Sequence, residues 1–203
     1  MVNFFDWVIN TPSKLELRRK YRDLTAKLTP YQRKIKSREI CRSIFANFKL
    51  PKNSIIAGYI PFKNEVDISL LMSLYHESGY RLCLPVIENK DFPLAFWEYA
   101  PGMELKKNKH YGFFEPKIPA EVLPDMVITP LVAFDAACNR LGQGAGFYDR
   151  TLNHLSGFKD FIAIAPAFSI QQTAYIKVEK FDYTLDAIIT EKRIFIAEER
   201  LLG

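Results

Sequence analysis

The stretch DMVITPLVAFDAACNRLGQGAGFYDR, residues 125–150, is the part of the chain around which the rest can be arranged. Its apolar run at 126–134 is interrupted by Pro130 and predicts one or two buried strands. A polar turn follows this run, and after it come three glycines at alternate positions: Gly142, Gly144 and Gly146. The segment 147–155 predicts a helix that begins directly after this glycine-rich loop.

The glycine-rich loop has the features of a phosphate-binding site. Three of the nine glycines in the chain lie within five residues, and glycine lets a ligand come close to the backbone N–H groups. Consecutive N–H groups form a concave site for anions, and Arg140 adds a permanent positive charge next to it. The competing interpretation is a tight turn without a ligand, because glycine also serves simply to provide turn geometry.

Two common nucleotide-binding motifs do not fit this loop. A P-loop requires Gly-Lys-Ser/Thr, and no lysine follows these glycines. A dinucleotide-binding fold requires Gly-x-Gly-x-x-Gly directly after its first strand, whereas this loop has Gly-x-Gly-x-Gly spacing late in the chain. The loop therefore matches neither motif.

The net charge of +5 is concentrated in one segment of the chain. Residues 14–42 contain eleven Lys and Arg against three Asp and Glu, a balance of +8, which leaves −3 for the remainder. A basic helical segment is most often a solvated surface. RNA binding would require aromatic residues among the basic ones, and only Tyr21 and Tyr31 are available. The remaining interpretation is an anionic small molecule bound between this segment and the body of the protein.

The basic segment predicts two helices. Ser13 and Glu16 form a capping box, and apolar residues recur at helical spacing after them. Lys14 and Arg18 lie four residues apart on one face near the start of this helix, where the helix dipole favours anions. Thr29, which is followed by proline, predicts the start of the second helix.

A second candidate ligand site lies at the end of an early strand. Residues 54–60 form an apolar run that predicts a buried strand, and the polar loop 61–67 follows its carboxyl end, where ligands bind in open α/β sheets. The loop holds Glu65 at this edge, although a solvated loop glutamate is the alternative. Because further apolar runs alternate with helical segments, we expect a three-layer α/β/α sandwich with a largely parallel, Rossmann-like central sheet.

Length and composition predict a single cytoplasmic domain over residues 1–203. No apolar run approaches the ~20 residues that span a bilayer, and the first residues lack the basic region of a signal peptide. The three cysteines show neither disulfide nor zinc spacing. We expect residues 1–12 to be an apolar tail and residues 13–50 to be basic helices, both packed on the body.

The residues Arg140 to Arg150, RLGQGAGFYDR, with the preceding PLVAFD, resemble the signature of the 5-formyltetrahydrofolate cyclo-ligases, or 5,10-methenyltetrahydrofolate synthetases. Other elements follow in the family's order: Lys-x-x-x-Arg at 14–18, Glu-Val-Asp at 65–67, Gly-x-x-Glu-Pro at 112–116 and Glu-x-x-Asp-x-x-x-Asp at 179–186. Phe181 departs from the His or Trp that many members carry there. The resemblance extends from residue 14 to residue 192.

The resemblance implies a reaction and its participants. Members of the family convert 5-formyltetrahydrofolate to 5,10-methenyltetrahydrofolate with ATP and Mg²⁺, and they release ADP and phosphate. Phosphorylation of the formyl oxygen makes the formyl carbon electrophilic and provides a leaving group, so that a neighbouring folate nitrogen can attack. By the same resemblance we expect a monomer that binds this folate and neither nucleic acid nor a membrane.

The resemblance also assigns roles to residues. Arg140 and Tyr148 are the expected catalytic residues. Glu65, Gly144 and Tyr148 are expected to bind the folate, and Asp149 and Asp186 to hold Mg²⁺. The expected nucleotide contacts comprise the first basic helix and the whole glycine-rich loop: Lys14, Arg18, Arg140, Leu141, Gly142, Gln143, Gly144, Ala145, Gly146, Phe147 and Tyr148.

Two other functions remain open at this stage. One is a nucleotide-binding paralogue that has kept the loop and lost the chemistry, against which the presence of Glu65, Tyr148 and Asp149 argues. The other is an RNA-binding module that uses the basic face of residues 14–42.

Overall fold

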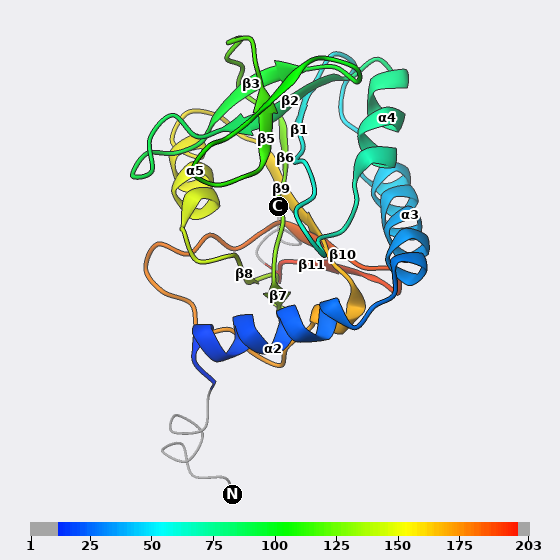
Figure 1. Cartoon of the computed structure of the whole chain (residues 1–203), viewed down its shortest axis with the longest axis vertical. Helices are drawn as coiled ribbons and strands as arrows, with labels where there is room; N and C mark the ends of the chain where they lie inside the picture. Colours follow the sequence, from blue (N-terminus) through cyan, green and yellow to red (C-terminus); the bar gives the residue numbers. More distant parts are fainter. Residues whose placement is uncertain (1–11, 199–203) are drawn as a thin grey trace, which may run out of the picture.

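The computed structural model describes residues 12–198 (Figure 1). The apolar tail expected at residues 1–12 lies outside the described residues, apart from its last residue. The basic segment forms the two expected helices, α2 (Lys14–Ala26) and α3 (Pro30–Asn47). Each begins with a capping box, in which Ser13 and Thr29 accept a hydrogen bond from the third residue of their helix.

The centre of the molecule is a seven-stranded sheet with the strand order β11-β10-β9-β6-β1-β2-β3. The five inner strands are parallel, and the edge strands β3 and β11 are antiparallel to their neighbours. The strands are β1 (Ile55–Ala57), β2 (Arg81–Val86), β3 (Ala95–Tyr99), β6 (Met126–Ile128), β9 (Ile162–Pro166), β10 (Ala187–Ile189) and β11 (Ile194–Ile196). The expectation of a largely parallel sheet is confirmed.

The chain winds in opposite directions from the middle of this sheet. From β1 it passes through α4 (Ser69–Glu77) to β2, whereas from β6 it passes through α5 (Phe147–Leu155) to β9 on the other side. Because such crossovers are right-handed, α4 and α5 must cover opposite faces of the sheet. This doubly wound arrangement confirms the three-layer prediction, and α5 has the bounds expected from the sequence (Figure 1).

Successive side chains of the strands point to opposite faces of the sheet, so a separate hydrophobic core forms on each face. Ile56 packs on the face covered by α3 and α4, and its neighbour Ala57 packs on the face covered by α5. The first core includes Ile40 and Ile44 of α3 and Leu71 and Tyr75 of α4, and the second includes Leu152 and Leu155 of α5. Burial on both faces explains why the strands are continuous apolar runs.

Helix α2 belongs to neither layer and lies beyond the carboxyl end of the sheet (Figure 1). It contacts β7 (Ala133–Phe134), which pairs with β8 (Arg140–Leu141), and the short helix η1 (Ser169–Gln171). Leu17 and Tyr21 are its buried apolar residues, and they form a small cluster with Val132, Ala133, Leu141 and Ile176. The Tyr21 hydroxyl also donates to the carbonyl of Gln172 at 2.8 Å.

Three local features complete the fold. The run 126–134 forms two buried strands, within the expectation of one or two, and they belong to different sheets because Pro130 has no N–H with which to continue the ladder. The last strand, β11, was not predicted from the sequence, and it follows β10 and forms the edge of the main sheet. A two-stranded hairpin, β4 (Leu105–Lys107) with β5 (Phe114–Pro116), lies outside the main sheet.

The central strand β1 provides a test of this architecture. We expect Ile56→Ala to lower the free energy of unfolding by about 2–5 kcal/mol, because Ile56 is completely buried and its truncation leaves a cavity. Chemical denaturation measures the change, and Ile118→Ala is the matched control, since Ile118 is 64% exposed. A loss for Ile56→Ala no greater than that of the control would contradict the placement of β1.

Candidate active site

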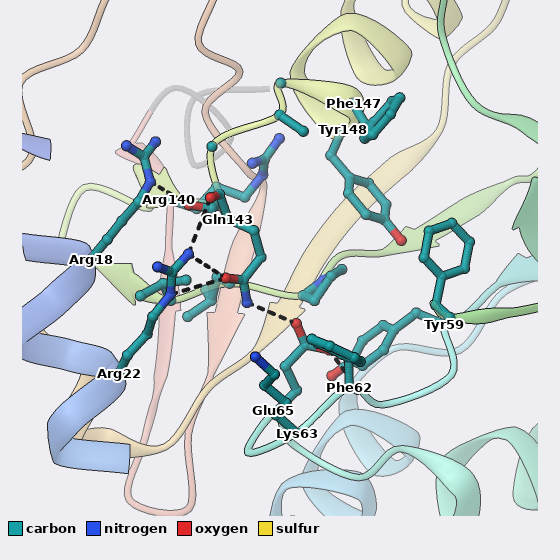
Figure 2. A pocket seen from close by; sticks show the side chains of 18 of the residues that line it. Arg18, Arg22, Tyr59, Phe62, Lys63, Glu65, Arg140, Gln143, Phe147 and Tyr148 are labelled. Carbon is teal, nitrogen blue, oxygen red and sulfur yellow. Dashed lines mark hydrogen bonds between the residues drawn. The ribbon is translucent and has the colours of Figure 1, made fainter. Parts of the chain in front are cut away.

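A cavity of about 940 Å³ lies at the carboxyl ends of β1 and β6. These adjacent strands are the point at which the winding reverses, which is where open α/β sheets bind ligands. The cavity is lined by the loop after β1, the segment after β6, the glycine-rich loop, one face of α2 and the β4–β5 hairpin (Figure 2). The two candidate sites inferred from sequence therefore form a single site.

The glycine-rich loop forms one wall of the cavity. Gly144 and Gly146 have φ values of +113° and +70°, a backbone region that other residues rarely adopt. Gly146 is also the residue at which α5 begins, and no side chain caps the N–H groups of its first turn. The loop thus presents backbone donors at a helix N-terminus, an arrangement suited to anions.

Arg140 extends from β8 behind this loop. Its side chain is only 2% exposed, and its Nη2 donates to Asp149 at 2.8 Å. Its Nε is buried and has no hydrogen-bond partner among the described residues. Burial lowers the pKa of Arg140, while the charge of Asp149 opposes that shift. A buried guanidinium with an unused donor, beside a cavity, is suited to hold an anionic group.

Three cationic side chains of α2 line the cavity beside this loop. Arg18 donates through Nε to the carbonyl of Gly142 at 2.9 Å, and Arg22 donates to Gln143 in the same loop. Lys14 pairs with Asp182 at 2.6 Å and with Glu179 at 3.0 Å. Burial works against the charged form of Lys14, but the two carboxylates outweigh it and raise its pKa. Arg22 was not among the expected residues, although its position four residues after Arg18 places both on one helical face.

Glu65 lies opposite the glycine-rich loop. Its Oε2 accepts from the N–H of Phe62 at 3.0 Å, and its Oε1 accepts from the Gln143 amide at 3.2 Å. Burial raises the pKa of Glu65, and these two hydrogen bonds lower it to a smaller extent. The Tyr148 hydroxyl points into the cavity (Figure 2), and burial together with the charge of Glu65 raises the pKa of Tyr148.

The structure does not bring the two expected magnesium ligands together. Asp149 lines the cavity, where it also accepts from the N–H of Tyr183 at 3.2 Å. Asp186 is absent from the lining, and its carboxylate accepts from the N–H of Ala163, near the amino end of β9 and away from the cavity. Asp182 and Glu179, from the same segment, do line the cavity. Within residues 12–198, no three Asp, Glu, His or Cys side chains are grouped to hold a metal ion by themselves.

Aromatic side chains complete the lining. Of the aromatic residues near the Gly-x-x-Glu-Pro element, Phe113 and Phe114 line the cavity, whereas Trp97 and Tyr99 do not. Tyr111, which the sequence analysis did not single out, packs edge-on against Phe147 with ring centroids 5.3 Å apart. These rings give the cavity flat apolar surfaces beside its charged wall.

Comparison with known proteins gives the family of the chain. The model of the 5-formyltetrahydrofolate cyclo-ligase family matches residues 10–191. A 5-formyltetrahydrofolate cyclo-ligase of Haemophilus influenzae is 32% identical over 188 residues, which cover 89% of this chain and 99% of the relative. One from Escherichia coli is 32% identical over 174 residues, which cover 83% and 94%.

Solved structures show the same fold. The NMR structure of the Aquifex aeolicus 5,10-methenyltetrahydrofolate synthetase superimposes with a TM-score of 0.73 and 25% identity, over 91% of this chain and 93% of that one. A 5,10-methenyltetrahydrofolate synthetase from Mycoplasma pneumoniae has a TM-score of 0.72 at 23% identity, over 89% and 99%.

The fold and these relatives define an α/β enzyme with a cavity at the carboxyl end of a doubly wound sheet. The chain belongs to the 5-formyltetrahydrofolate cyclo-ligase family. Among residues 12–198, no helix is long and apolar enough to cross a membrane.

The raised pKa of Glu65 predicts a pH-dependent difference in stability. The folded protein disfavours the ionised form of Glu65. The stability that the protonated residue contributes is therefore complete below its unfolded pKa of about 4.3, and it is lost as the pH rises through the pKa of Glu65 in the folded protein. Glu65→Gln cannot ionise, so we expect it to gain stability relative to the wild type between about pH 4 and pH 7.

Urea unfolding at several pH values measures this difference. Glu104→Gln, which removes a carboxylate whose side chain is 74% exposed, is the matched control. A Glu65→Gln difference that stays constant across the pH range would contradict the raised pKa of this half-buried carboxylate.

Proposed function

We propose that this chain catalyses the ATP- and Mg²⁺-dependent cyclisation of 5-formyltetrahydrofolate to 5,10-methenyltetrahydrofolate, with release of ADP and phosphate. The observation that carries the proposal is the division of one cavity into two walls: a wall suited to anions, with Arg140 and the glycine-rich loop, and an opposite wall with the half-buried carboxylate of Glu65. A nucleotide and a folate must bind next to each other in one cavity, because the terminal phosphate of the nucleotide must reach the formyl oxygen of the folate.

The anion-binding wall is the proposed nucleotide site. Lys14, Arg18 and Arg140 would bind the phosphates together with the backbone of residues 141–147, as the sequence predicts. Arg22 joins them from the next turn of α2. The cavity is lined by three cations of α2, Lys14, Arg18 and Arg22, and their position favours a small anionic ligand over RNA.

The opposite wall is the proposed folate site. Glu65 would accept two parallel hydrogen bonds from the amino group and ring N–H of the pterin, a pairing for which a carboxylate is well suited. Tyr148 lines the cavity, its ring centroid lies 5.9 Å from the guanidinium carbon of Arg140, and the charge of Glu65 acts on its hydroxyl, so it would contact both ligands. Its raised pKa keeps the hydroxyl protonated at neutral pH, so it would act as a hydrogen-bond donor or proton relay near the attacking nitrogen.

Carboxylates beside the phosphate wall fit a magnesium ion. Asp149 and Asp182 both line the cavity and provide oxygen ligands, the type that Mg²⁺ prefers. Mg²⁺ commonly binds through one or two carboxylates, substrate phosphates and water, so two side chains are sufficient. We therefore propose Asp149 and Asp182, in place of Asp149 and Asp186, as its ligands. The bound ion would neutralise negative charge on the phosphates.

The proposed reaction has two steps. The formyl oxygen attacks the terminal phosphorus of ATP, and the bond between that phosphorus and the ADP oxygen breaks. The neighbouring folate nitrogen then attacks the formyl carbon and loses its proton, and the carbon–oxygen bond to phosphate breaks. The protein supplies position and positive charge for both steps, because neither requires a nucleophilic side chain.

An absorbance assay tests the proposed function. Purified protein is mixed with 5-formyltetrahydrofolate with and without Mg-ATP, and formation of the methenyl product is followed in the near ultraviolet. Product that forms only with Mg-ATP supports the proposal. Nucleotide binding without any product would instead indicate a paralogue that has lost the chemistry.

Arg140 should contribute mainly to turnover. We expect Arg140→Ala to lower kcat by about 10²–10³, because it removes a preorganised donor aimed at the transferring phosphate. Arg140→Lys keeps the charge but not the paired donors, and it should retain intermediate activity. Circular dichroism checks that both variants fold. Unchanged turnover in a folded Arg140→Ala protein would remove Arg140 from the reaction.

The magnesium ligands can be distinguished by the metal concentration that the reaction requires. We expect Asp182→Asn to raise the Mg²⁺ concentration for half-maximal activity by about tenfold or more, because one charged oxygen ligand is lost. The same titration of Asp186→Asn is the comparison. A larger shift for Asp186→Asn than for Asp182→Asn would return the role to Asp186.

A further inference from the structure

Gln143 connects the two walls of the cavity through its side-chain amide (Figure 2). Its Oε1 accepts from Arg22 of α2, at 2.7 Å from Nη2 and 3.2 Å from Nε. Its Nε2 donates to Oε1 of Glu65 at 3.2 Å. We call this chain of hydrogen bonds, from Arg22 through Gln143 to Glu65, the Gln143 bridge.

On the folate side, the bridge occupies an acceptor that the substrate needs. One oxygen of Glu65 accepts from the backbone of Phe62, and the other accepts from Gln143. Each carboxylate oxygen has about two acceptor positions and Gln143 takes one of those on Oε1, so a ligand that donates two parallel hydrogen bonds to this carboxylate meets the Gln143 amide at that oxygen. Binding at Glu65 and the intact bridge are in competition.

On the nucleotide side, the bridge uses the guanidinium of Arg22, a cation that phosphates attract. The hydrogen bonds of the Arg22 guanidinium go to the Gln143 side chain and, at 3.2 Å, to the Gln143 carbonyl. Among the described residues no carboxylate lies within 4.0 Å of it. A phosphate offers this guanidinium a charged acceptor in place of a neutral amide, which is the stronger interaction.

The chemistry of the amide explains why a glutamine can connect these groups. A carboxamide carries an acceptor and a donor at its two ends, so it can accept from Arg22 and donate to Glu65 at once. A carboxylate at this position would accept from Arg22 but would repel Glu65. An apolar side chain would make neither bond.

We propose that Gln143 is a positioning residue that couples the binding of the two ligands, an inference that rests on the proposed function of the cavity. Phosphates that draw Arg22 away remove the charged donor that holds the Gln143 amide, and Glu65 is then released for the folate. A folate that displaces Gln143 from Glu65 frees Arg22 for the phosphates in the same way. The two ligands therefore assist each other, and thermodynamic linkage requires the effect to be equal in both directions.

Binding measurements test this coupling without turnover. The probes are 5-formyltetrahydrofolate and the Mg²⁺ complex of the β,γ-imido analogue of ATP, which does not transfer its phosphate. Each is titrated alone and in the presence of saturating amounts of the other. In the wild type we expect each Kd to fall by about twofold to tenfold when the other ligand is present, the range that one exchanged hydrogen bond allows.

Gln143→Met is the decisive variant, because it keeps the length of the side chain and removes its hydrogen bonds with both Arg22 and Glu65. We expect its coupling to be lower than that of the wild type by about the same twofold to tenfold factor. 5-Formyltetrahydrofolate alone should also bind it at least as tightly as the wild type, since no amide has to leave Glu65. Arg81→Ala is the matched control, because it removes an exposed arginine that pairs with Glu98 at the start of β2. It should keep the full coupling.

The outcomes separate this inference from the proposed function. Wild-type protein that binds both ligands without mutual assistance overturns the inference alone, as does coupling that is unchanged in Gln143→Met. Coupling lost equally in Arg81→Ala also overturns it, because the effect would then not depend on the Gln143 bridge. Wild-type protein that binds neither ligand overturns the proposed function and the inference with it.

Discussion

The reversal of winding between β1 and β6 is the constraint on which the site depends. Right-handed crossovers place α4 on one face of the sheet and α5 on the other, so neither connection covers the gap between the carboxyl ends of these two strands. The loop with Glu65 leaves from one strand, and the segment that leads to Arg140 leaves from the other. Residues far apart in the sequence therefore face each other across one cavity, and α2 closes its remaining side.

The cavity also neutralises some of its own charges. Arg140 pairs with Asp149, and Lys14 pairs with Asp182 and Glu179. A buried charge without a partner would be strongly destabilising, so these pairs are needed as long as no ligand is bound. A magnesium nucleotide would bring a partner for each member of a pair, since its phosphates attract the cations and its metal ion attracts the carboxylates. Under the proposed function, binding is then an exchange of partners that leaves few charges unpaired.

Much of the fold follows from the sequence because its signals are local. The capping boxes at Ser13 and Thr29 mark the helix starts, and the glycine-rich loop fixes the start of α5. The short edge strand β11 was missed, because three residues after a polar turn carry little pattern. The choice of Asp186 instead of Asp182 has a different cause. Between residues 179 and 186 the chain passes from the cavity to the amino end of β10, and spacing in the sequence does not show which carboxylate stays in the cavity.

The position of α2 has a consequence for the order in which the molecule is assembled. The ribosome makes this helix before any strand of the sheet, yet its apolar partners Val132, Leu141 and Ile176 come from the later part of the chain. The ion-pair partner of Lys14, Asp182, is also synthesised much later than the helix. The helix that provides much of the positive charge can complete its contacts only when synthesis has passed residue 182. The nascent chain can therefore build its sheet core step by step, but the cavity is finished only after this late segment has been made.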